Sequence, residues 1–536
     1  MPSNFSKNLI IFILIFALFF SLYFFLRNII YDTDDITYTM NAESGIKNDY
    51  IFWSSQHPLW GPLDVLAYQA SKKLGNTEGA LVPLQFINSI FGALAVSMFF
   101  LSLYILTGNR IVSLLVAMIF GVSFYFWHWS GCIKHYSVAT FFTVLILYFI
   151  VRLEKGGTLN ALGAGLATGI SALFHSANII IFLPIGITIL IMKKTIIRNI
   201  SNFLTYIIGL ILFFVTPHLF IMNYFLGIQF NNFFFWAPSY PWFGLQTRFQ
   251  GFDFNFNLQR LPIFLDRFWN IMAGFYSYYG NNPLYYFIWK NYFPILLILT
   301  GFFFIISIFR LFKERYPLMI FFILWIVLQW IGLWFVDPFN FFIYIILLPI
   351  LSIFAVSLTC FIEKFKKSRM VQYSSILLLL ILLIPLFFTN LFAAIIPAHQ
   401  YNPFMETINH YRNIIKRTDT VVSSGINPDS VYFKYFIRAN IIDIVGLHQH
   451  YPTIKPDEIL KRLKIQVNSA LQESKIIYIH NDLLNEKTEV PPWAPSNMNM
   501  SSISQFFKKN YIIEPIPGDD IGKYLILKKK HDKKQP

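Results

Sequence analysis

The chain has 536 residues, of which 56% are hydrophobic and only 13% charged, and its formal net charge is +15 at pH 7. Soluble domains carry about 25% charged residues, so this composition excludes an ordinary soluble protein. The positive charge does not indicate a nucleic-acid partner, because the basic residues lie in short clusters between apolar blocks, as in the loops of a membrane protein. Two cysteines, Cys132 and Cys360, are too few to predict a disulfide framework or a thiolate metal site.

Apolar blocks of the length that crosses a hydrocarbon core of about 30 Å as a helix predict about eleven transmembrane spans. The first block, residues 9–26, follows Lys7 and lacks a small-residue cleavage site, which indicates an uncleaved helix with a cytoplasmic N-terminus. The other blocks lie at residues 84–106, 111–127, 136–152, 160–174, 176–192, 203–222, 291–310, 317–336, 341–362 and 374–396.

Charged and titratable residues divide between the two sides of the membrane when these spans alternate. Every basic cluster between spans falls inside, as the positive-inside rule expects. The aspartates of the membrane part fall outside. A single histidine at a helix border is most simply a hydrated polar residue, but the one-sidedness of the whole set predicts an outer-face site. The outer histidines at helix borders are His57, His128, His135, His175 and His218.

Two outer loops, residues 27–83 and 223–290, are long, and long loops in compact architectures are usually functional. In the first loop, Asp32, Asp34 and Asp35 follow the first helix closely. Their mutual repulsion raises at least one pKa unless a cation compensates, which suits a general base or a cationic partner. A hydrated helix end explains the cluster equally well. Aromatic residues of the second loop, such as those of 231–236, favour anchoring at the membrane interface.

The same first loop carries His57-Pro58 and Trp60 close together, in a stretch that two prolines stiffen. Such a stretch can orient groups over a site. The plainer interpretation is that Pro62 starts a helix.

The composition changes near Ala398, where charged residues become frequent. A helix is predicted over residues 456–474 because Pro456, Asp457 and Glu458 suit a helix start. We therefore divide the chain into a transmembrane domain, residues 1–397, and a small soluble α/β domain, residues 398–536, which an odd number of spans puts outside. This domain has no glycine-rich phosphate loop. Its predicted strands are residues 420–424, 441–445, 475–480, 511–515 and 523–528.

The run Asp34-Asp35-Ile36-Thr37-Tyr38, placed in the first outer loop of a many-helix chain with a soluble outer tail, resembles the GT-C glycosyltransferases. These include protein O-mannosyltransferases and lipid A aminoarabinose transferases, which commonly have Asp-Glu-x-x-Tyr or a close variant there. The resemblance implies a multi-pass cell-membrane enzyme. It would move a sugar from a polyprenyl-phosphate-linked donor to a protein, lipid or glycan acceptor on the outer face, with inversion at the anomeric carbon.

In that resemblance Asp34 matches the aspartate that deprotonates the acceptor, whereas Asp35 stands where a glutamate is usual. Arginines of the second outer loop, Arg248 and Arg267 with Arg260 and Lys290, are candidates for the donor phosphate, because guanidinium groups pair bidentately with phosphate. Contacts with lipid headgroups explain them equally. The further candidate substrate-binding residues are Asp32, Tyr38, His57, His135 and His175.

A divalent cation is left open, and no metal site or cofactor is predicted. The spacing Asp32-x-Asp34 suits a cation, but hard cations require several more oxygen ligands. The alternatives to a transferase are a transporter or flippase, a polymerase or ligase for lipid-linked glycans, and a non-catalytic scaffold. The apolar blocks have few charges near their centres and show no internal repeat, which disfavours transport.

Overall fold

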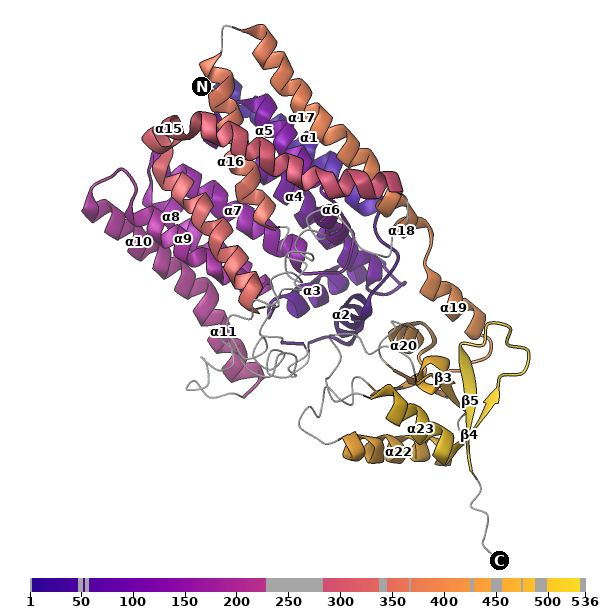
Figure 1. Ribbon diagram of the computed structural model, residues 1–536. Helices are drawn as coiled ribbons and strands as arrows, with labels where there is room; N and C mark the ends of the chain where they lie inside the picture. The colour runs from indigo at the N-terminus through magenta and orange to yellow at the C-terminus, as the bar shows by residue number, and fades with distance from the viewer. Residues whose placement is uncertain are drawn as a thin grey trace, which may run out of the picture. The chain divides into compact units, whose positions relative to one another are not determined.

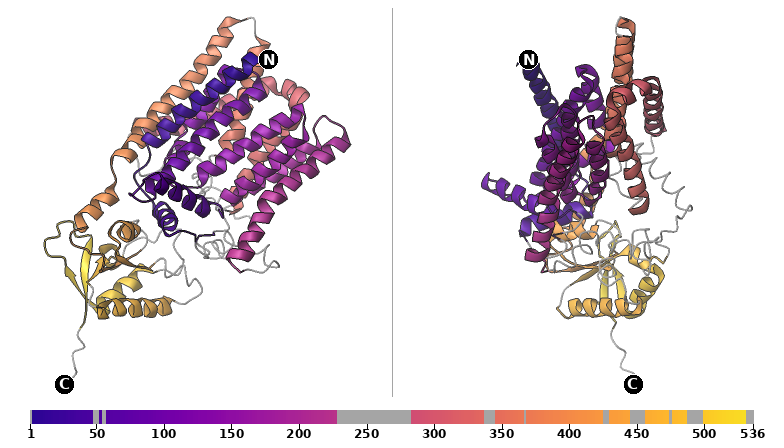
Figure 2. Two further views of the ribbon diagram at one scale, coloured as in Figure 1. Left: turned by 180° about the vertical axis from the view of Figure 1, so that it is seen from behind. Right: turned by 90° about the vertical axis from the view of Figure 1, so that its left-hand side faces the viewer.

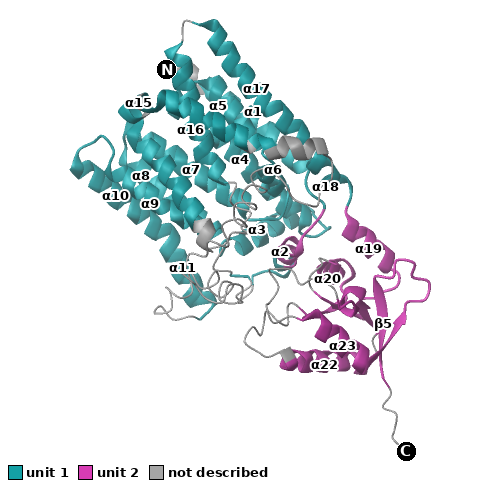
Figure 3. Cartoon of the chain, in the orientation of Figure 1, with its two compact units in different colours: residues 1–29, 41–241, 255–401 teal, residues 30–40, 242–254, 402–536 magenta. Residues whose placement is uncertain are grey.

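The computed structural model describes residues 2–46, 52–53, 57–227, 283–336, 345–365, 368–424, 429–444, 456–473, 476–486 and 499–530. Contacts within the chain divide it into two compact units (Figure 3). Unit 1 comprises the described residues of 1–29, 41–241 and 255–401, and unit 2 comprises residues 30–40 together with the described residues of 402–536. The acidic segment that follows the first helix therefore contacts the C-terminal part of the chain.

Unit 1 is a bundle of helices that run side by side (Figure 1, Figure 2). Its central members are α4, α7 and α8, with α4 and α8 packed on either side of α7. The helices are α1 (Pro2–Phe25), α3 (Trp60–Lys73), α4 (Leu81–Thr107), α5 (Arg110–Gly121), α6 (Phe124–Ser130), α7 (Tyr136–Lys155), α8 (Thr158–Phe174), α9 (Phe182–Leu190), α10 (Ile196–Leu210), α11 (Thr216–Phe220), α15 (Pro283–Val336), α16 (Leu347–Lys364), α17 (Arg369–Asn390) and α18 (Ile396–Gln400).

Among the described residues, seven helices are long and apolar enough to cross a membrane. An eighth candidate is the pair α5 and α6, which bends by 67° at its break. Shorter apolar helices cover Thr158–Phe174, Ser176–Leu190 and Pro294–Ile308. Each apolar block predicted from the sequence overlaps one of these segments, but three of the segments are shorter than a span. The described residues therefore give seven or eight candidate spans where the sequence predicted about eleven. The chain is a multi-pass membrane protein, as its composition predicted.

The basic loops of unit 1 meet at one end of the bundle. Arg315 Nη1 lies 3.0 Å from Glu154 Oε2, and Lys193 Nζ donates to the carbonyl of Lys313 at 2.6 Å. Glu154 is near the last residue of α7, and a helix of 20 residues is about 30 Å long. Residues at the start of α7 therefore lie at the opposite end of unit 1 from the basic loops.

Unit 2 contains a five-stranded sheet with the order β2-β1-β3-β5-β4. Strands β1, β2 and β3 are parallel, and β5 is antiparallel to both β3 and β4. All five predicted strands are confirmed, and so is the helix that begins at Pro456. The elements are α19 (Pro403–Tyr411), β1 (Thr420–Ser423), α20 (Asp429–Tyr432), β2 (Asn440–Asp443), α22 (Pro456–Gln472), β3 (Ile477–His480), α23 (Met500–Asn510), β4 (Tyr511–Pro515) and β5 (Tyr524–Lys529).

The core of unit 2 joins one face of the sheet to the apolar faces of α22 and α23. Val422 and Ile479 from the central strands pack with Leu463 of α22 and Phe507 of α23, and all four side chains are buried. Helix α22 turns a narrow apolar stripe to the sheet and a charged face to solvent, as its sequence pattern requires. This core fixes the sheet and the loops at its edges.

Glycine allows helices α8 and α10 to pack at backbone contact. A Cβ atom at Gly165 would lie 2.2 Å from the carbonyl oxygen of Tyr206 and 3.1 Å from Cα of Gly209. Backbone approach at small residues is a common way for membrane helices to associate, because apolar burial drives association little within lipid.

We expect Gly165→Val to lower the free energy of unfolding by about 1–3 kcal/mol, because the added side chain must separate two backbones. Thermal unfolding of the purified protein in detergent measures the effect. The control is Gly301→Val in α15, where an added Cβ would meet nothing within 4 Å. Equal unfolding temperatures for the two variants would contradict the packing argument.

Candidate active site

The acidic run predicted from the sequence forms the N-terminus of helix α2 (Thr33–Ser44). Asp32 Oδ1 accepts a hydrogen bond from the backbone N–H of Asp35 at 2.9 Å, and Asp35 Oδ2 accepts one from the N–H of Asp32 at 3.1 Å. This is a capping box, with aspartate in the place of the usual glutamate. Two of the three carboxylates therefore bind backbone donors at the positive end of a helix, which offsets their mutual repulsion.

The third carboxylate, Asp34, lies in the first turn of α2 and is exposed. Tyr38 follows four residues later, so the two side chains share one face of the helix. Asp35 is buried, with 2% of its surface exposed. The acidic run thus separates into a buried capping carboxylate, Asp35, and an accessible one, Asp34.

A phenol from the C-terminal part of the chain holds the start of this segment within unit 2. Tyr432 Oη accepts hydrogen bonds from the backbone N–H of Tyr31 at 2.7 Å and from Asn402 Nδ2 at 3.1 Å. Burial raises the pKa of the Tyr432 phenol above its ordinary value, so it stays protonated. Tyr432 and Asn402 therefore act as positioning residues for the acidic helix.

Three of the histidines predicted to form an outer site come together in unit 1. The ring of His135 stacks on that of His57, with centroids 4.4 Å apart, and meets the ring of His175 at 5.3 Å. Trp60 and Tyr136 complete the aromatic surround. The histidines come from the residues before α3, the start of α7 and the end of α8, which lie at the end of the bundle opposite the basic loops.

Polar side chains of the bundle interior set this arrangement. Gln85 Nε2 on α4 donates to the carbonyls of Asn28 at 2.6 Å and Gly131 at 2.9 Å, and Asn88 Nδ2 donates to the carbonyl of Cys132 at 2.6 Å. These bonds hold the loop that leads directly into Lys134 and His135. They also satisfy carbonyls that would otherwise be buried without a donor.

A second set of hydrogen bonds aligns the end of α8 with the start of α7. Asn178 Nδ2 donates to Ser171 Oγ at 2.7 Å and to Thr143 Oγ1 at 3.2 Å. Ser171 Oγ in turn donates to the carbonyl of Ala139 at 3.0 Å. His175 ends α8, and its Nδ1 accepts from the N–H of Ala177 at 3.3 Å. The ring of His175 is thereby held against α7.

The cluster places imidazole rings beside a buried lysine and a helix N-terminus. Burial lowers the pKa of His135 well below its ordinary value, and the neighbouring His57, His175 and Lys134 lower it further. Burial therefore favours the uncharged form of His135, and Lys134, which lies beside it, is 3% exposed. The N-terminus of α7 adds its positive dipole end and its first backbone N–H groups.

The predicted phosphate-binding residues of the second outer loop cannot be placed at either group. Arg248 and Arg267, with Arg260, lie outside the described residues, and so does the side chain of Lys290. Their proposed role at the donor phosphate remains a prediction.

Asp64 of α3 is a further candidate residue. It is one of the aspartates predicted to lie outside the membrane, but no role was predicted for it. It is 1% exposed, its Oδ2 is buried without a hydrogen-bond partner, and burial raises its pKa well above the ordinary value. It lies one helical turn after Trp60, whose ring contacts that of His135. Buried carboxyl groups with raised pKa values gather at functional sites. The spacing Trp60-x-x-x-Asp64 is the sequence signal for this residue, since it puts both on one face of a helix.

A further polar group lies in unit 2 at the carboxyl ends of the parallel strands. His480, the last residue of β3, is buried, with Nε2 3.7 Å from Asp429 Oδ2 and Nδ1 3.4 Å from Asp482 Oδ2. The edge of Tyr524 packs on its ring. This edge of a parallel sheet is where α/β domains commonly bind ligands.

No protein-family model and no curated protein matches the chain. Several solved structures match it, including the following three. ArnT from Cupriavidus metallidurans bound to undecaprenyl phosphate has a TM-score of 0.57 at 9% identity, with 97% of this chain and 98% of that chain covered. The apo form of ArnT has a TM-score of 0.53 at 9% identity, with 98% of each chain covered. The Archaeoglobus fulgidus oligosaccharyltransferase complex with Zn and sulfate has a TM-score of 0.54 at 12% identity, with 97% of this chain and 73% of that chain covered.

At identities this low, the likeness shows the fold. The chain has a GT-C-like fold, with a polytopic helical membrane part and a small α/β part near the C-terminus, as the sequence predicted.

The buried carboxyl group of Asp64 gives a prediction on pH. Its folded-state pKa lies above the unfolded value, so the folded state keeps a proton that the unfolded chain releases. The contribution of this carboxyl group to the free energy of unfolding is greatest below the unfolded-state pKa of about 3.9. It is lost as the pH rises through the folded-state pKa. We therefore expect the unfolding temperature of Asp64→Asn, relative to that of the unsubstituted chain, to rise between about pH 4 and pH 8.

Thermal unfolding in detergent across that pH range measures this difference. The control is Glu78→Gln, the same loss of a carboxyl group at an exposed position of unit 1. Parallel pH profiles for the unsubstituted chain and Asp64→Asn would show that the Asp64 carboxyl group has the same pKa in both states.

Proposed function

We propose that the chain is a membrane glycosyltransferase that moves a sugar from a polyprenyl-phosphate-linked donor to an acceptor hydroxyl at the outer face of the membrane. The observation that carries the proposal is the separation of roles in α2, where Asp32 and Asp35 cap the helix and Asp34 stays accessible. The GT-C-like fold of the chain supports the same class of reaction.

In the proposed reaction, Asp34 accepts the proton of the acceptor hydroxyl as its oxygen attacks the anomeric carbon. The bond between that carbon and the phosphate oxygen breaks on the opposite face of the sugar, so the configuration inverts. The polyprenyl phosphate leaves with the bonding electron pair. A carboxylate at the water boundary suits this step, because the acceptor arrives from the aqueous side and its hydroxyl must come within hydrogen-bond distance of the base.

We propose that the histidine cluster of unit 1, which consists of His57, His135 and His175 with Lys134, binds the phosphate of the donor. Lys134 supplies a positive charge and the imidazoles supply N–H donors, while the N-terminus of α7 adds its dipole. The polyprenyl chain would lie among the apolar helices. The undecaprenyl phosphate bound to ArnT supports a ligand of this kind.

The proposed orientation puts the basic loops in the cytoplasm together with the N-terminus. The histidine cluster then faces outward, because it lies at the other end of α7 from Glu154 and Lys155. The soluble domain, residues 398–536, is also outside in this proposal. The positive-inside rule is the physical support for the assignment.

The proposed base gives the first functional prediction. We expect Asp34→Asn to reduce transfer by about 10²–10⁴-fold, because an amide cannot accept the proton. Mass spectrometry of surface glycans, glycolipids and glycoproteins measures transfer in cells that lack the protein, carry the native chain or carry the variant at matched abundance. A mass increment that disappears without the protein identifies the sugar and the acceptor.

The matched control for Asp34→Asn is Glu78→Gln, which removes another exposed carboxyl group and should restore the increment in full. Asp35→Asn is a poorer test of chemistry, because Asp35 caps α2 and its loss also destabilises the helix. If Asp34→Asn restores every glycan, the proposed base is wrong, and the transporter and polymerase alternatives gain support.

The proposed donor site gives a second functional prediction. We expect Lys134→Gln to weaken binding of undecaprenyl phosphate by about 10-fold, equivalent to about 1.4 kcal/mol, because a charged contact with the phosphate is lost. The shift in unfolding temperature on titration with this lipid, in detergent, measures the affinity.

Lys155→Gln is the matched control, since Lys155 is the exposed last residue of α7 and lies at the other end of the same helix. It should leave the affinity unchanged. Equal weakening by both substitutions would indicate a general effect of net charge, and no weakening by Lys134→Gln would remove the histidine cluster from the proposed donor site.

A further inference from the structure

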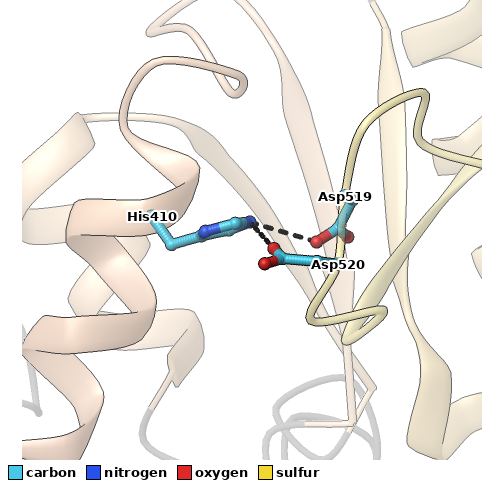
Figure 4. A group of neighbouring side chains, drawn as sticks. All are labelled: His410, Asp519 and Asp520. Carbon is cyan, nitrogen blue, oxygen red and sulfur yellow. Dashed lines mark hydrogen bonds and ion pairs between the residues drawn. The ribbon is translucent and has the colours of Figure 1, made fainter.

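A histidine and two aspartates of unit 2 point toward one another at a site separate from the acidic helix (Figure 4). His410 lies in the last turn of α19, and Asp519 and Asp520 lie in the loop between β4 and β5. His410 Nε2 is 3.1 Å from Asp519 Oδ1 and 3.7 Å from Asp520 Oδ1. The three ligand atoms all lie within 4.8 Å of one another.

The two distances from His410 Nε2 are close to those between ligands of one transition-metal ion. Imidazole nitrogens and carboxylate oxygens bind Zn²⁺ at about 2.0–2.2 Å, so two ligands at a tetrahedral angle are about 3.3–3.6 Å apart. The two measured distances from His410 Nε2 bracket that range. Structural zinc sites usually have four protein ligands, so these three would leave the fourth position of the ion to water.

Two hydrogen bonds from neighbouring residues fix the orientation of the Asp519 carboxylate. Tyr411 donates its hydroxyl proton to Asp519 Oδ2 at 2.7 Å, and the N–H of Ile521 donates to Oδ1 at 3.0 Å. The Asp519 side chain is 2% exposed, whereas that of Asp520 is 88% exposed. One ligand is therefore fixed from inside the domain, and another leaves an entry path from solvent. Such supporting hydrogen bonds are typical of metal sites.

Among the described residues, no ion pair joins a lysine to Asp519 or Asp520. Lys523, three residues after Asp520, instead directs its ammonium group to Thr407 Oγ1 at 2.8 Å. Without an ion, His410 Nε2 is hydrogen-bonded to Asp519, and the adjacent Asp520 lies within ion-pair distance of the same nitrogen. A bound cation would replace these contacts, so metal uptake distinguishes the two arrangements.

We propose that His410, Asp519 and Asp520 bind a divalent transition-metal ion of the Zn²⁺ type, which ties α19 to the β4–β5 loop. The two ligand-bearing segments are 109 residues apart in the chain. An ion that binds only the folded state stabilises that state, so its role would be to hold α19 to the hairpin of β4 and β5.

The test is a titration of the full chain, purified in detergent and treated with a chelator, with Co²⁺. Co²⁺ bound in a tetrahedral nitrogen and oxygen site gives visible absorption bands that Zn²⁺ then abolishes by displacement. We expect one equivalent of Co²⁺ per chain, with the bands absent in His410→Gln and in Asp520→Asn. The matched control is Asp457→Asn, the same change at an exposed position in the first turn of α22.

Asp520 is almost fully exposed, so Asp520→Asn should unfold at the same temperature as the unsubstituted chain when a chelator is present. Zn²⁺ should raise the unfolding temperature of the unsubstituted chain and leave that of Asp520→Asn unchanged. Absence of Co²⁺ uptake by the unsubstituted chain would reduce the group to an ion pair and overturn the proposal. Equal uptake by Asp520→Asn and His410→Gln would overturn it too, because the ion would then bind elsewhere, for example at the acidic helix.

Discussion

The side-chain amide of Gln85 joins two separate segments at one end of the membrane bundle. Gln85 donates to the carbonyls of both Asn28 and Gly131, so it joins the end of the first helix to the loop before His135. The N–H of Ile29 donates to the carbonyl of Ala398, which brings the start of the acidic segment beside the end of the last membrane helix. Inside a membrane protein such backbone groups require partners, because no water replaces them.

The distribution of burial decides which titratable groups can act. Asp32 and Asp35 each accept a backbone N–H at the start of α2, and Asp35 is buried while Asp32 and Asp34 are exposed. In unit 1, burial lowers the pKa of His135, and Lys134 lies beside it. In the proposed transfer, the first group supplies the base and the second binds the phosphate of the donor. Each is set by ordinary helix chemistry rather than by an unusual backbone conformation.

Periodicity and local chemistry explain why so much of the fold could be predicted. The apolar blocks match helices because a span needs a fixed apolar length, and the five strands of unit 2 match because their apolar runs are short and bounded by turns. Pro456 begins α22 as predicted, since proline at the first helical position loses no hydrogen bond. The acidic cluster was also visible, but its capping role was not, because the same three residues suit a metal site, a base or a helix end.

The sequence by itself determined the membrane class, the spans, the strands and the candidate residues, because each depends on composition and short-range spacing. Only the tertiary structure decided which distant residues meet. Tyr432 binds the N–H of Tyr31 across 401 residues, and His410 meets Asp519 across 109. His57, His135 and His175 come from three segments whose rings converge only when α7 and α8 pack. Such contacts are fixed by the packing of whole elements, and local sequence carries no record of that packing.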